Sequence, residues 1–284
     1  MSKARAAGIA LCAALAFAAA ARSEPAVHLR TLRLVDRTRA AHFANGTSGP
    51  RVLVTEVRYP SGRGPFPLVV FAHGFALVPD TYARLLDAWT RAGFVVAAPV
   101  FPIESANARG GPSQSDLPNE PRDLSFVLSR LLAPGSPVRR LIDPHRIAFA
   151  GQSDGGIAAL AASYDRRYRD RRVDAAMILS GAPFAGFTAP PAGAPPLLAV
   201  QGTADPFNAP ATTASYCRLM RRPKFLLWLL GASHRPPYTT DDRYLGVVER
   251  TTVAFLDRYL RRGPLRPLLA AGARPGVARL VAAP

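Results

Sequence analysis

A serine between two glycines is the residue of this chain best suited to act as a nucleophile. Residues 151–155 read Gly-Gln-Ser-Asp-Gly, with Ser153 at the centre. A short apolar run that suits a buried strand precedes this segment, and residues that favour a helix follow it. In such a strand-turn-helix context the hydroxyl stands above the sheet, and the close approach of strand and helix requires small residues at Gly151 and Gly155. We therefore predict that Ser153 is a nucleophile carried on a strained turn.

A histidine and a carboxylate that could activate this serine lie further along the chain. His234 is the only histidine after Ser153, and it follows an apolar segment over residues 224–230. Asp205 lies just after another apolar segment, in a Gly-Thr-Ala-Asp-Pro turn. Five other aspartates compete for the carboxylate role, namely Asp165, Asp170, Asp174, Asp241 and Asp242. The turn position favours Asp205, and we predict a Ser153–His234–Asp205 triad in which His234 is the general base.

A second motif could hold the negative charge that forms when a serine attacks a carbonyl group. That charge requires two backbone N–H groups, one from the residue after the nucleophile and one from the loop after the third strand. Residues 73–75, His-Gly-Phe, follow the third predicted strand. We predict that the N–H groups of Phe75 and Asp154 form this oxyanion hole, and we interpret His73 as structural. The Asp154 carboxylate would oppose the oxyanion unless it points away or is paired, for example with an arginine.

Apolar segments alternate with helix-forming segments along most of the chain. Strands are predicted over residues 27–36, 51–59, 68–71, 94–98, 147–150, 175–179, 197–200 and 224–230. Helices are predicted over residues 79–92, 120–132, 156–162, 211–221 and 240–260. This alternation predicts an α/β fold with a mostly parallel central sheet, an antiparallel N-terminal strand and helices on both faces. Catalytic groups would then gather at the carboxyl ends of the strands.

Two connections between these elements bear on the predicted site. Residues 184–196 are too few to build a helical lid, so we expect no large lid domain and an open site. Residues 101–119 form a long polar loop, which we expect to border the substrate cleft because long loops in compact domains are often functional. The aromatic residues that could line an apolar cleft are Phe75, Phe101, Phe184, Phe187 and Trp228.

The two ends of the chain differ in composition from the rest. Residues 1–21 combine Lys3 and Arg5 with an apolar run and small residues, which predicts a secretory signal peptide, the alternative being an uncleaved anchor. We expect the mature protein to be extracellular or periplasmic. Residues 22–262 are predicted to form the catalytic domain. Residues 263–284, rich in Pro, Ala and Arg, are predicted to be a loosely ordered tail.

Composition limits the partners of the protein. The formal net charge is +17, but the arginines are scattered and no nucleic-acid motif accompanies them, so we expect weak association with anionic surfaces at most and no specific nucleic-acid partner. Loss of a signal peptide would remove Cys12 and leave Cys217, so no intrachain disulfide could form. Because no cluster of histidines and cysteines offers a metal site, we expect neither a metal nor an organic cofactor.

The motifs together resemble those of the α/β-hydrolase superfamily over about residues 30–260. The matching segments are His73-Gly74-Phe75, Gly151–Gly156, Gly202–Asp205 and Gly231–His234. The chain most resembles the lidless branch of dienelactone-hydrolase-like, chlorophyllase-like and platelet-activating-factor acetylhydrolase-like serine esterases. Dienelactone hydrolases proper carry a cysteine nucleophile where this chain has Ser153. Bacterial cutinases usually carry Met or His after the nucleophile, and Asp154 departs from that pattern.

The residues and the resemblance lead to one expected function and two alternatives. We expect a secreted serine hydrolase, lipase-like in the wide sense, that cleaves small-molecule or lipid carboxylic esters through an acyl-enzyme intermediate. A peptidase or an acyltransferase would use the same triad, because both share the acyl-enzyme step. A non-catalytic binding protein on a hydrolase scaffold is the alternative from a different class.

Overall fold

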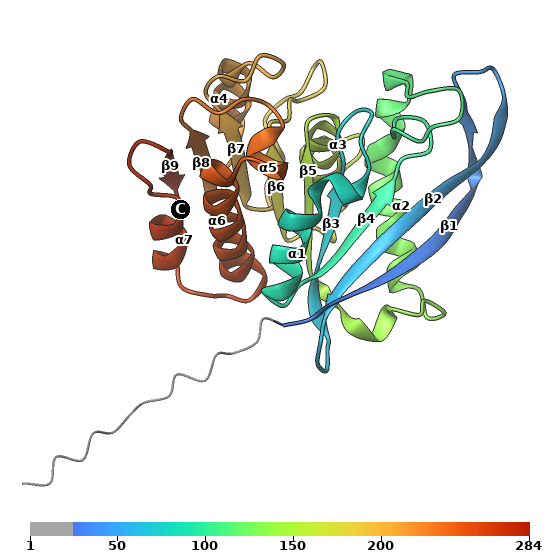
Figure 1. Cartoon of the computed structure of the whole chain (residues 1–284), viewed down its shortest axis with the longest axis horizontal. Helices are drawn as coiled ribbons and strands as arrows, with labels where there is room; N and C mark the ends of the chain where they lie inside the picture. The colour runs from blue at the N-terminus through green and yellow to red at the C-terminus, as the bar shows by residue number, and fades with distance from the viewer. Residues whose placement is uncertain (1–24) are drawn as a thin grey trace, which may run out of the picture.

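One mixed sheet organises the computed structural model, which describes residues 25–284. Nine strands of the described chain run in the order β1-β2-β4-β3-β5-β6-β7-β8-β9 (Figure 1). Their bounds are β1 Val27–His42, β2 Ser48–Pro60, β3 Phe66–Ala72, β4 Val95–Val100, β5 Ile142–Gln152, β6 Ala175–Leu179, β7 Leu197–Gly202, β8 Lys224–Leu229 and β9 Ala278–Ala283. All eight predicted strands are present. The predicted signal peptide over residues 1–21 lies outside the described residues.

The strands that carry the predicted catalytic residues lie in the parallel part of the sheet. The six strands from β4 to β8 in the sheet order pair in parallel. β2 is antiparallel to both β1 and β4. The prediction of a mostly parallel sheet with an antiparallel N-terminal strand is therefore confirmed. The carboxyl ends of β5, β7 and β8 consequently point to the same edge of the sheet.

The C-terminal segment differs from its prediction as a loosely ordered tail. Residues 263–284 include helix α7 (Arg266–Ala271) and strand β9, which pairs antiparallel with β8 from Lys224–Ala283 to Leu229–Ala278. Without β9, the outer edge of β8 would present unpaired backbone N–H and C=O groups. A further strand can form hydrogen bonds with these groups whatever its side chains are. Composition rich in Pro, Gly and Ala obscured this strand, because backbone pairing at a sheet edge needs few apolar residues.

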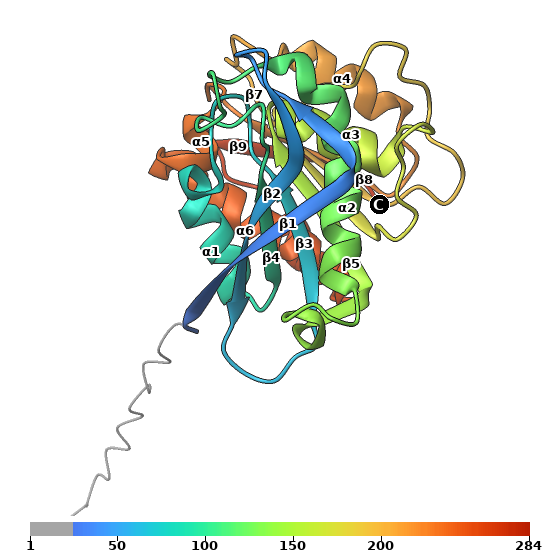
Figure 2. The same cartoon turned by 90° about the vertical axis from the view of Figure 1, so that its right-hand side faces the viewer.

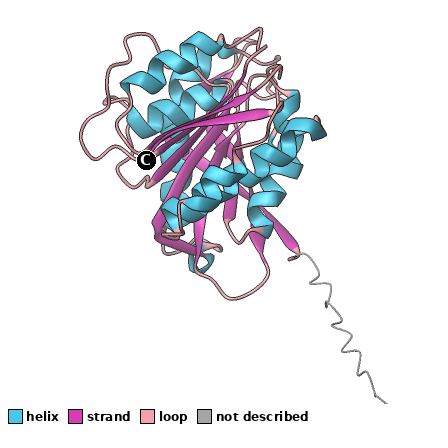
Figure 3. Ribbon diagram, turned by 90° about the vertical axis from the view of Figure 1, so that its left-hand side faces the viewer, coloured by secondary structure: helices cyan, strands magenta, loops and turns pink. Residues whose placement is uncertain are grey.

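Helices cover both faces of the sheet, as predicted (Figure 3). The helices on one face are α2 (Glu120–Leu132), α3 (Asp154–Tyr164) and α4 (Pro210–Leu219). The helices on the other face are α1 (Ala83–Arg91), α5 (Pro236–Thr239), α6 (Asp242–Leu260) and α7. Short 3-10 turns add η1 (Pro79–Tyr82), η2 (Gln114–Asn119) and η3 (Arg139–Leu141). The predicted helix over residues 79–92 is thus divided into η1 and α1.

Alternation along β3 explains how one strand serves two cores. Leu68 and Val70 pack among the residues of one face, whereas Val69 and Phe71 pack among those of the other. All four side chains are fully buried. A continuous apolar strand of this kind is expected where both faces of a parallel sheet are covered, and it fixes β3 rigidly at the centre of the molecule.

The first two strands extend well beyond their predicted bounds. β1 and β2 form a long antiparallel hairpin that leans across the α2 side of the molecule (Figure 2). A bulge between Asp36 and Ala40 shifts the register, after which pairing continues to His42 and Ser48. The polar residues around this bulge hid the continuation of β1 from the sequence pattern. Its consequence is that Arg39 and Arg51 reach α2.

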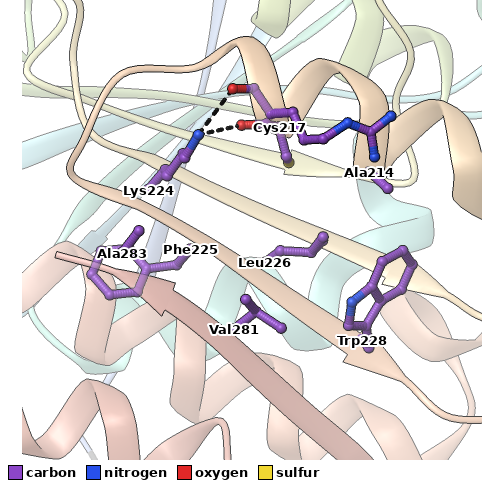
Figure 4. Close-up of a pocket in the computed structure, with 9 residues that line it drawn as sticks. Ala214, Cys217, Lys224, Phe225, Leu226, Trp228, Val281 and Ala283 are labelled. Carbon is purple, nitrogen blue, oxygen red and sulfur yellow. Dashed lines mark hydrogen bonds between the residues drawn. The ribbon is translucent and has the colours of Figure 1, made fainter.

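An apolar hollow of about 280 Å³ lies between α4 and the β8–β9 edge (Figure 4). Trp228 and Val281 contribute to its wall. The Lys224 ammonium group donates to the carbonyl oxygens of Cys217, Arg218 and Met220, so it closes the C-terminus of α4. Cys217 itself is buried and is a free thiol. The lining of this hollow contains two side chains of nucleophilic type, the buried Cys217 thiol and the Lys224 amine, and the amine is held by three carbonyl oxygens.

No helix in the described part of the chain is long and apolar enough to cross a membrane.

Candidate active site

Ser153 lies at a sharp turn between β5 and α3. Its backbone adopts φ 55° and ψ −123°, a strained conformation for a residue with a side chain. A Cβ atom on Gly151 would lie 2.1 Å from the carbonyl oxygen of Gly155, and one on Gly155 would lie 2.2 Å from that of Ala72. The two glycines therefore allow the chain to turn from strand to helix without a steric clash, as the sequence motif predicts.

The structure brings Ser153, His234 and Asp205 together. His234 Nε2 lies 2.8 Å from Ser153 Oγ, and His234 Nδ1 lies 2.8 Å from Asp205 Oδ2. Ser153 follows β5, Asp205 follows β7, and His234 follows β8, so the three side chains meet at one edge of the sheet. An ionised Asp205 accepts the Nδ1 proton, which leaves Nε2 free to accept a proton from the serine hydroxyl.

The competing aspartates have other partners. Asp165 and Asp170 pair with Arg167 and Arg172, and the carboxylate of Asp174 accepts a hydrogen bond from the backbone of β5. At the start of α6, Asp241 caps the helix and Asp242 pairs with Arg84. These interactions hold the five carboxylates away from His234.

Four donors around Asp205 favour its ionised form. Oδ1 accepts from the backbone N–H groups of Phe207 and Asn208 at 2.9 and 3.0 Å, and Oδ2 also accepts from Gln201 Nε2 at 2.9 Å. Burial alone would raise the pKa of Asp205, but the hydrogen bonds from His234 and from the backbone outweigh burial and lower it. Thr213 fixes the amide of Gln201 by donating to its oxygen. Sequence reasoning missed Gln201, which no spacing rule links to the triad.

The two predicted oxyanion donors are unoccupied within the described chain. The N–H group of Asp154 is at the first position of α3, where a helix has no internal acceptor. Neither it nor the N–H group of Phe75 donates to an acceptor of the described residues. Gly74 allows the two segments to approach, because a Cβ atom there would lie 2.9 Å from Gln152 Oε1 and 3.1 Å from Ser153 Cβ. Both N–H groups are thus available to a ligand beside Ser153.

Gln152 connects the oxyanion segment to the triad. Tyr82 donates to its side-chain oxygen at 2.7 Å, and the Gly74 N–H group donates to the Tyr82 hydroxyl at 3.2 Å. On the other side, Gln152 Nε2 donates to the carbonyl oxygen of His234 at 3.2 Å. The position of Gln152 inside the motif gave no sign of this role, because its partners are 70 and 82 residues away.

The Asp154 side chain is paired, but with an amide instead of an arginine. Gln114 Nε2 donates to Asp154 Oδ2 at 2.5 Å. Gln114 begins the turn η2 within the long polar loop, and it lines the same pocket as Ser153. The expectation that this loop borders the cleft agrees with that position.

The pocket around Ser153 has a volume of about 540 Å³, within the usual range for small-ligand sites. Phe75, Leu77 and Phe207 supply apolar walls. Phe207 is 79% exposed, and its ring centre lies 5.1 Å from that of His234. Of the five aromatic candidates only Phe75 lines this pocket, because Phe101 is in the core and the other three lie beside other hollows. No sequence pattern pointed to Phe207.

His73 is structural, as interpreted from the sequence. The ring is fully buried, its Nδ1–H group donates to the Gly74 carbonyl oxygen, and its Nε2 atom accepts from the Phe101 N–H group. Burial disfavours the charged ring and lowers the pKa of His73 to about 4.

This buried ring makes the stability of the protein sensitive to acid. The unfolded chain binds a proton at His73 below pH 6.5 and the folded chain only near pH 4, so folding loses stability as the pH falls through that window. We expect His73 to account for a loss of about 3 kcal/mol in the free energy of unfolding between pH 7 and 4. Denaturant titrations at a series of pH values should show that the free energy of unfolding falls less steeply with falling pH in His73→Gln than in the wild type. The expectation would be contradicted if this pH dependence were the same in His73→Gln as in the wild type, or if the control His145→Gln, at an exposed histidine, reduced it equally.

No group of three or more His, Cys, Asp or Glu side chains in residues 25–284 has the arrangement of a metal site.

Comparisons with known proteins show a family model, a curated relative and a solved structure to which the chain is similar. A family model described as chlorophyllase matches residues 31–214. Chlorophyllase-1, chloroplastic, of Citrus sinensis is 28% identical over 114 residues, which are 40% of this chain and 32% of that relative, so the match spans about a third of the relative's length. The ferulic acid esterase from Streptomyces cinnamoneus superposes with a TM-score of 0.68 at 24% identity, covering 87% of this chain and 93% of that one. This likeness confirms the predicted fold.

Proposed function

The chain belongs to the chlorophyllase family, and on that premise we propose that it is a secreted serine hydrolase that cleaves carboxylic esters. The observation that carries this proposal is the continuous chain of hydrogen bonds from Ser153 through His234 to Asp205. Two unoccupied backbone N–H groups next to the serine complete the parts that acyl transfer needs.

The proposed reaction has two halves. His234 accepts the hydroxyl proton of Ser153 while the serine oxygen attacks the carbonyl carbon of the ester. The N–H groups of Phe75 and Asp154 hold the oxyanion, and each such donor contributes about 3–4 kcal/mol in comparable enzymes. The protonated His234 then gives its proton to the leaving alkoxide, and an alcohol departs. In the second half His234 takes a proton from water, which attacks the carbonyl carbon of the acyl-enzyme. His234 then gives that proton to Ser153 Oγ as its bond to the acyl group breaks, and the acid is released.

The shape of the pocket supports small-molecule or lipid esters as substrates. Residues 184–196 form a loop in the structure, and no helix in the described residues lies within that connection. Apolar walls formed by Phe75, Leu77 and Phe207 stand beside polar groups at the serine. Such a pocket suits an apolar acyl or alcohol group held next to a carbonyl carbon.

The proposal is tested by hydrolysis of p-nitrophenyl esters from acetate to palmitate, combined with labelling by a fluorophosphonate probe. We expect the wild-type protein to hydrolyse the esters and to be labelled, and we expect Ser153→Ala to lose both properties. The acyl chain length that is hydrolysed fastest indicates the length of the acyl pocket. Labelling without turnover of any ester would favour a peptidase or an acyltransferase with a narrow substrate. Neither labelling nor turnover in a folded sample would reject the proposal and favour a binding protein.

We also propose that residues 1–21 direct export. The positive charges of Lys3 and Arg5 followed by an apolar run support this proposal. Expression in a bacterial host, followed by N-terminal sequencing of the exported protein, tests it. A mature protein that begins near residue 22 is expected, and a full-length protein held in the membrane would point to an uncleaved anchor.

Phe207 is expected to contribute to binding instead of to chemistry. Truncation in Phe207→Ala removes an exposed apolar face beside His234, which we expect to cost about 1 kcal/mol of substrate binding. KM for the longer esters should rise about 5-fold while kcat stays within about 2-fold. Leu219→Ala, which removes an exposed leucine at a different hollow, is the matched control and should change neither constant. A fall in kcat alone would show that Phe207 instead positions the histidine.

A further inference from the structure

Two buried glutamates outside the triad have no evident ionic partner. Glu104 and Glu120 are both fully buried, and none of their four carboxylate oxygens accepts a hydrogen bond from a donor group of the described residues. Glu104 lies in the loop after β4, and Glu120 is the first residue of α2. Their carboxyl groups are close enough to form a hydrogen bond with each other once one of them carries a proton.

Nearby cations do not neutralise this pair. Arg51 donates to both Asp116 and Asp123, and Arg39 donates to Asp123, so the arginines of this region are engaged by other carboxylates. Two buried carboxylates in contact cannot both be ionised without a large electrostatic cost, and the group protonates instead. Burial raises the pKa of Glu104 to about 8 and holds that of Glu120 well above its usual value. The pair is therefore protonated at neutral pH.

Glu104 contacts both segments that supply the oxyanion donors. Its backbone carbonyl oxygen accepts from the Ala76 N–H group at 2.9 Å, directly after Phe75. Its carboxyl group lies within hydrogen-bonding reach of the Asp154 carboxyl group. A second backbone bond, from Ala106 N–H to the Leu77 carbonyl oxygen at 3.2 Å, holds the same two loops together. Glu104 is thus the point at which the Phe75 loop, the polar loop and the start of α3 meet.

We propose that Glu104 and Glu120 form a proton-sharing acid pair that positions the oxyanion hole, an inference that rests on the proposed ester hydrolysis. Glu120 donates its proton to Glu104, and Glu104 donates its own to the Asp154 carboxylate, which Gln114 also holds. Two protons on three carboxyl groups leave one negative charge, drawn toward Glu104 and Gln114 and away from the oxyanion. Glu104 and Glu120 are positioning residues, since neither touches the substrate.

This arrangement predicts an alkaline limit to catalysis. When Glu104 loses its proton, near pH 8, a second negative charge faces Asp154 and the bond between them is lost. The other titratable groups that face Glu104 are Asp116 and the hydroxyl of Tyr82. Asp116 is already paired with Arg51, and burial keeps the pKa of Tyr82 far above this range, so neither group compensates for the new charge. We therefore expect kcat to fall as the pH rises through about 8.

Amide and alanine substitutions at Glu104 separate this proposal from a general packing role. Glu104→Gln keeps a donor toward Asp154 but cannot titrate, so kcat at pH 7 should stay within about 3-fold of wild type and the alkaline fall should disappear. Glu104→Ala should lower kcat about 10- to 100-fold at pH 7 with KM within about 2-fold, because misplaced oxyanion donors affect the transition state alone. Glu249→Gln, at a half-buried glutamate on α6, is the matched control and should keep the wild-type profile.

Two results would overturn the proposal. One is an alkaline limb that persists in Glu104→Gln, and the other is a Gln variant as inactive at pH 7 as the Ala variant. Infrared difference spectra between pH 7 and 10 give a readout that needs no substrate: a protonated carboxyl band should vanish in the wild type and be weaker from the start in Glu104→Gln. That band would be retained if only the proposed ester hydrolysis failed, and its absence from the wild type would reject the acid pair itself.

Discussion

Replacing Ser153 with alanine is expected to lower kcat for the best ester by about six orders of magnitude. The estimate follows a serine protease in which loss of one triad member costs about as much as loss of all three. For the same reason the double variant Ser153→Ala, His234→Ala should be hardly slower than either single variant, because the two residues act as one unit. Stopped-flow and long-term hydrolysis assays of the single and double variants measure both effects.

A second serine–histidine pair in the same chain supplies the control. On the β1–β2 hairpin the imidazole of His42 lies 2.8 Å from the Ser48 hydroxyl, the same distance as in the predicted triad. Within residues 25–284, this exposed pair has no non-glycine residue at positive φ and no hydrogen bond between a carboxylate and its imidazole. Ser48→Ala should therefore leave kcat and fluorophosphonate labelling unchanged. Additive losses in the double variant at Ser153 and His234, or a large loss in Ser48→Ala, would contradict the triad.

Removing the guanidinium group of the buried Arg51 is expected to destabilise the fold more than the substitutions of Glu104. Arg51 is fully buried, and it donates to Asp123 at 2.7 Å and to Asp116 at 2.6 and 3.1 Å. Burial alone would lower the pKa of Arg51, but its hydrogen bonds with Asp123 and Asp116 raise it. In Arg51→Met two carboxylates lose their main cation, and the free energy of unfolding should fall by about 3–5 kcal/mol.

Denaturant titrations of matched variants test the source of this loss. Arg51→Lys keeps a charge but not the planar fork, so it should recover only part of the stability. Arg84→Ala removes an arginine from an exposed pair with Asp242 and should cost less than about 1 kcal/mol. An equally small loss in Arg51→Met would mean that water or a proton replaces the guanidinium group without penalty. Asp123 keeps its pair with Arg39 in Arg51→Met, whereas Asp116 is left without a cation. Arg51→Met combined with Asp116→Leu should therefore regain stability, since an apolar replacement removes the unpaired charge.

Local sequence could predict those features that depend on neighbouring residues. The strand, turn and helix around Ser153 follow from adjacent residues, and the glycines at 151 and 155 meet a steric demand that no other residue type meets. The helix over residues 120–132 has the predicted bounds. Its position in a turn after a parallel strand favours Asp205 over the five other aspartates, because a carboxylate there can reach a histidine on the next strand.

Features that depend on distant partners remained outside such reasoning. The bond between Tyr82 and Gln152 joins segments 70 residues apart, and the link between Gln201 and Asp205 depends on how Thr213 orients an amide. The acid pair of Glu104 and Glu120 depends on the fold bringing two separate segments into one buried space. Residues 278–283 form strand β9 because the edge of β8 is otherwise unpaired, and no property of these residues themselves predicts this.

The buried thiol of Cys217, on the side of α4 that faces the sheet, can report motions of the sheet edge. Cys217 is 8% exposed, and burial raises its pKa to about 12, so almost none of it is thiolate in the native state at neutral pH. Alkylation of this sulfur must wait until α4 lifts from β8 or the domain unfolds. In a Cys12→Ser background, the alkylation rate divided by that of a free thiol reports how often this region opens. The protein therefore carries its own reporter of local unfolding beside β8, the strand that precedes His234.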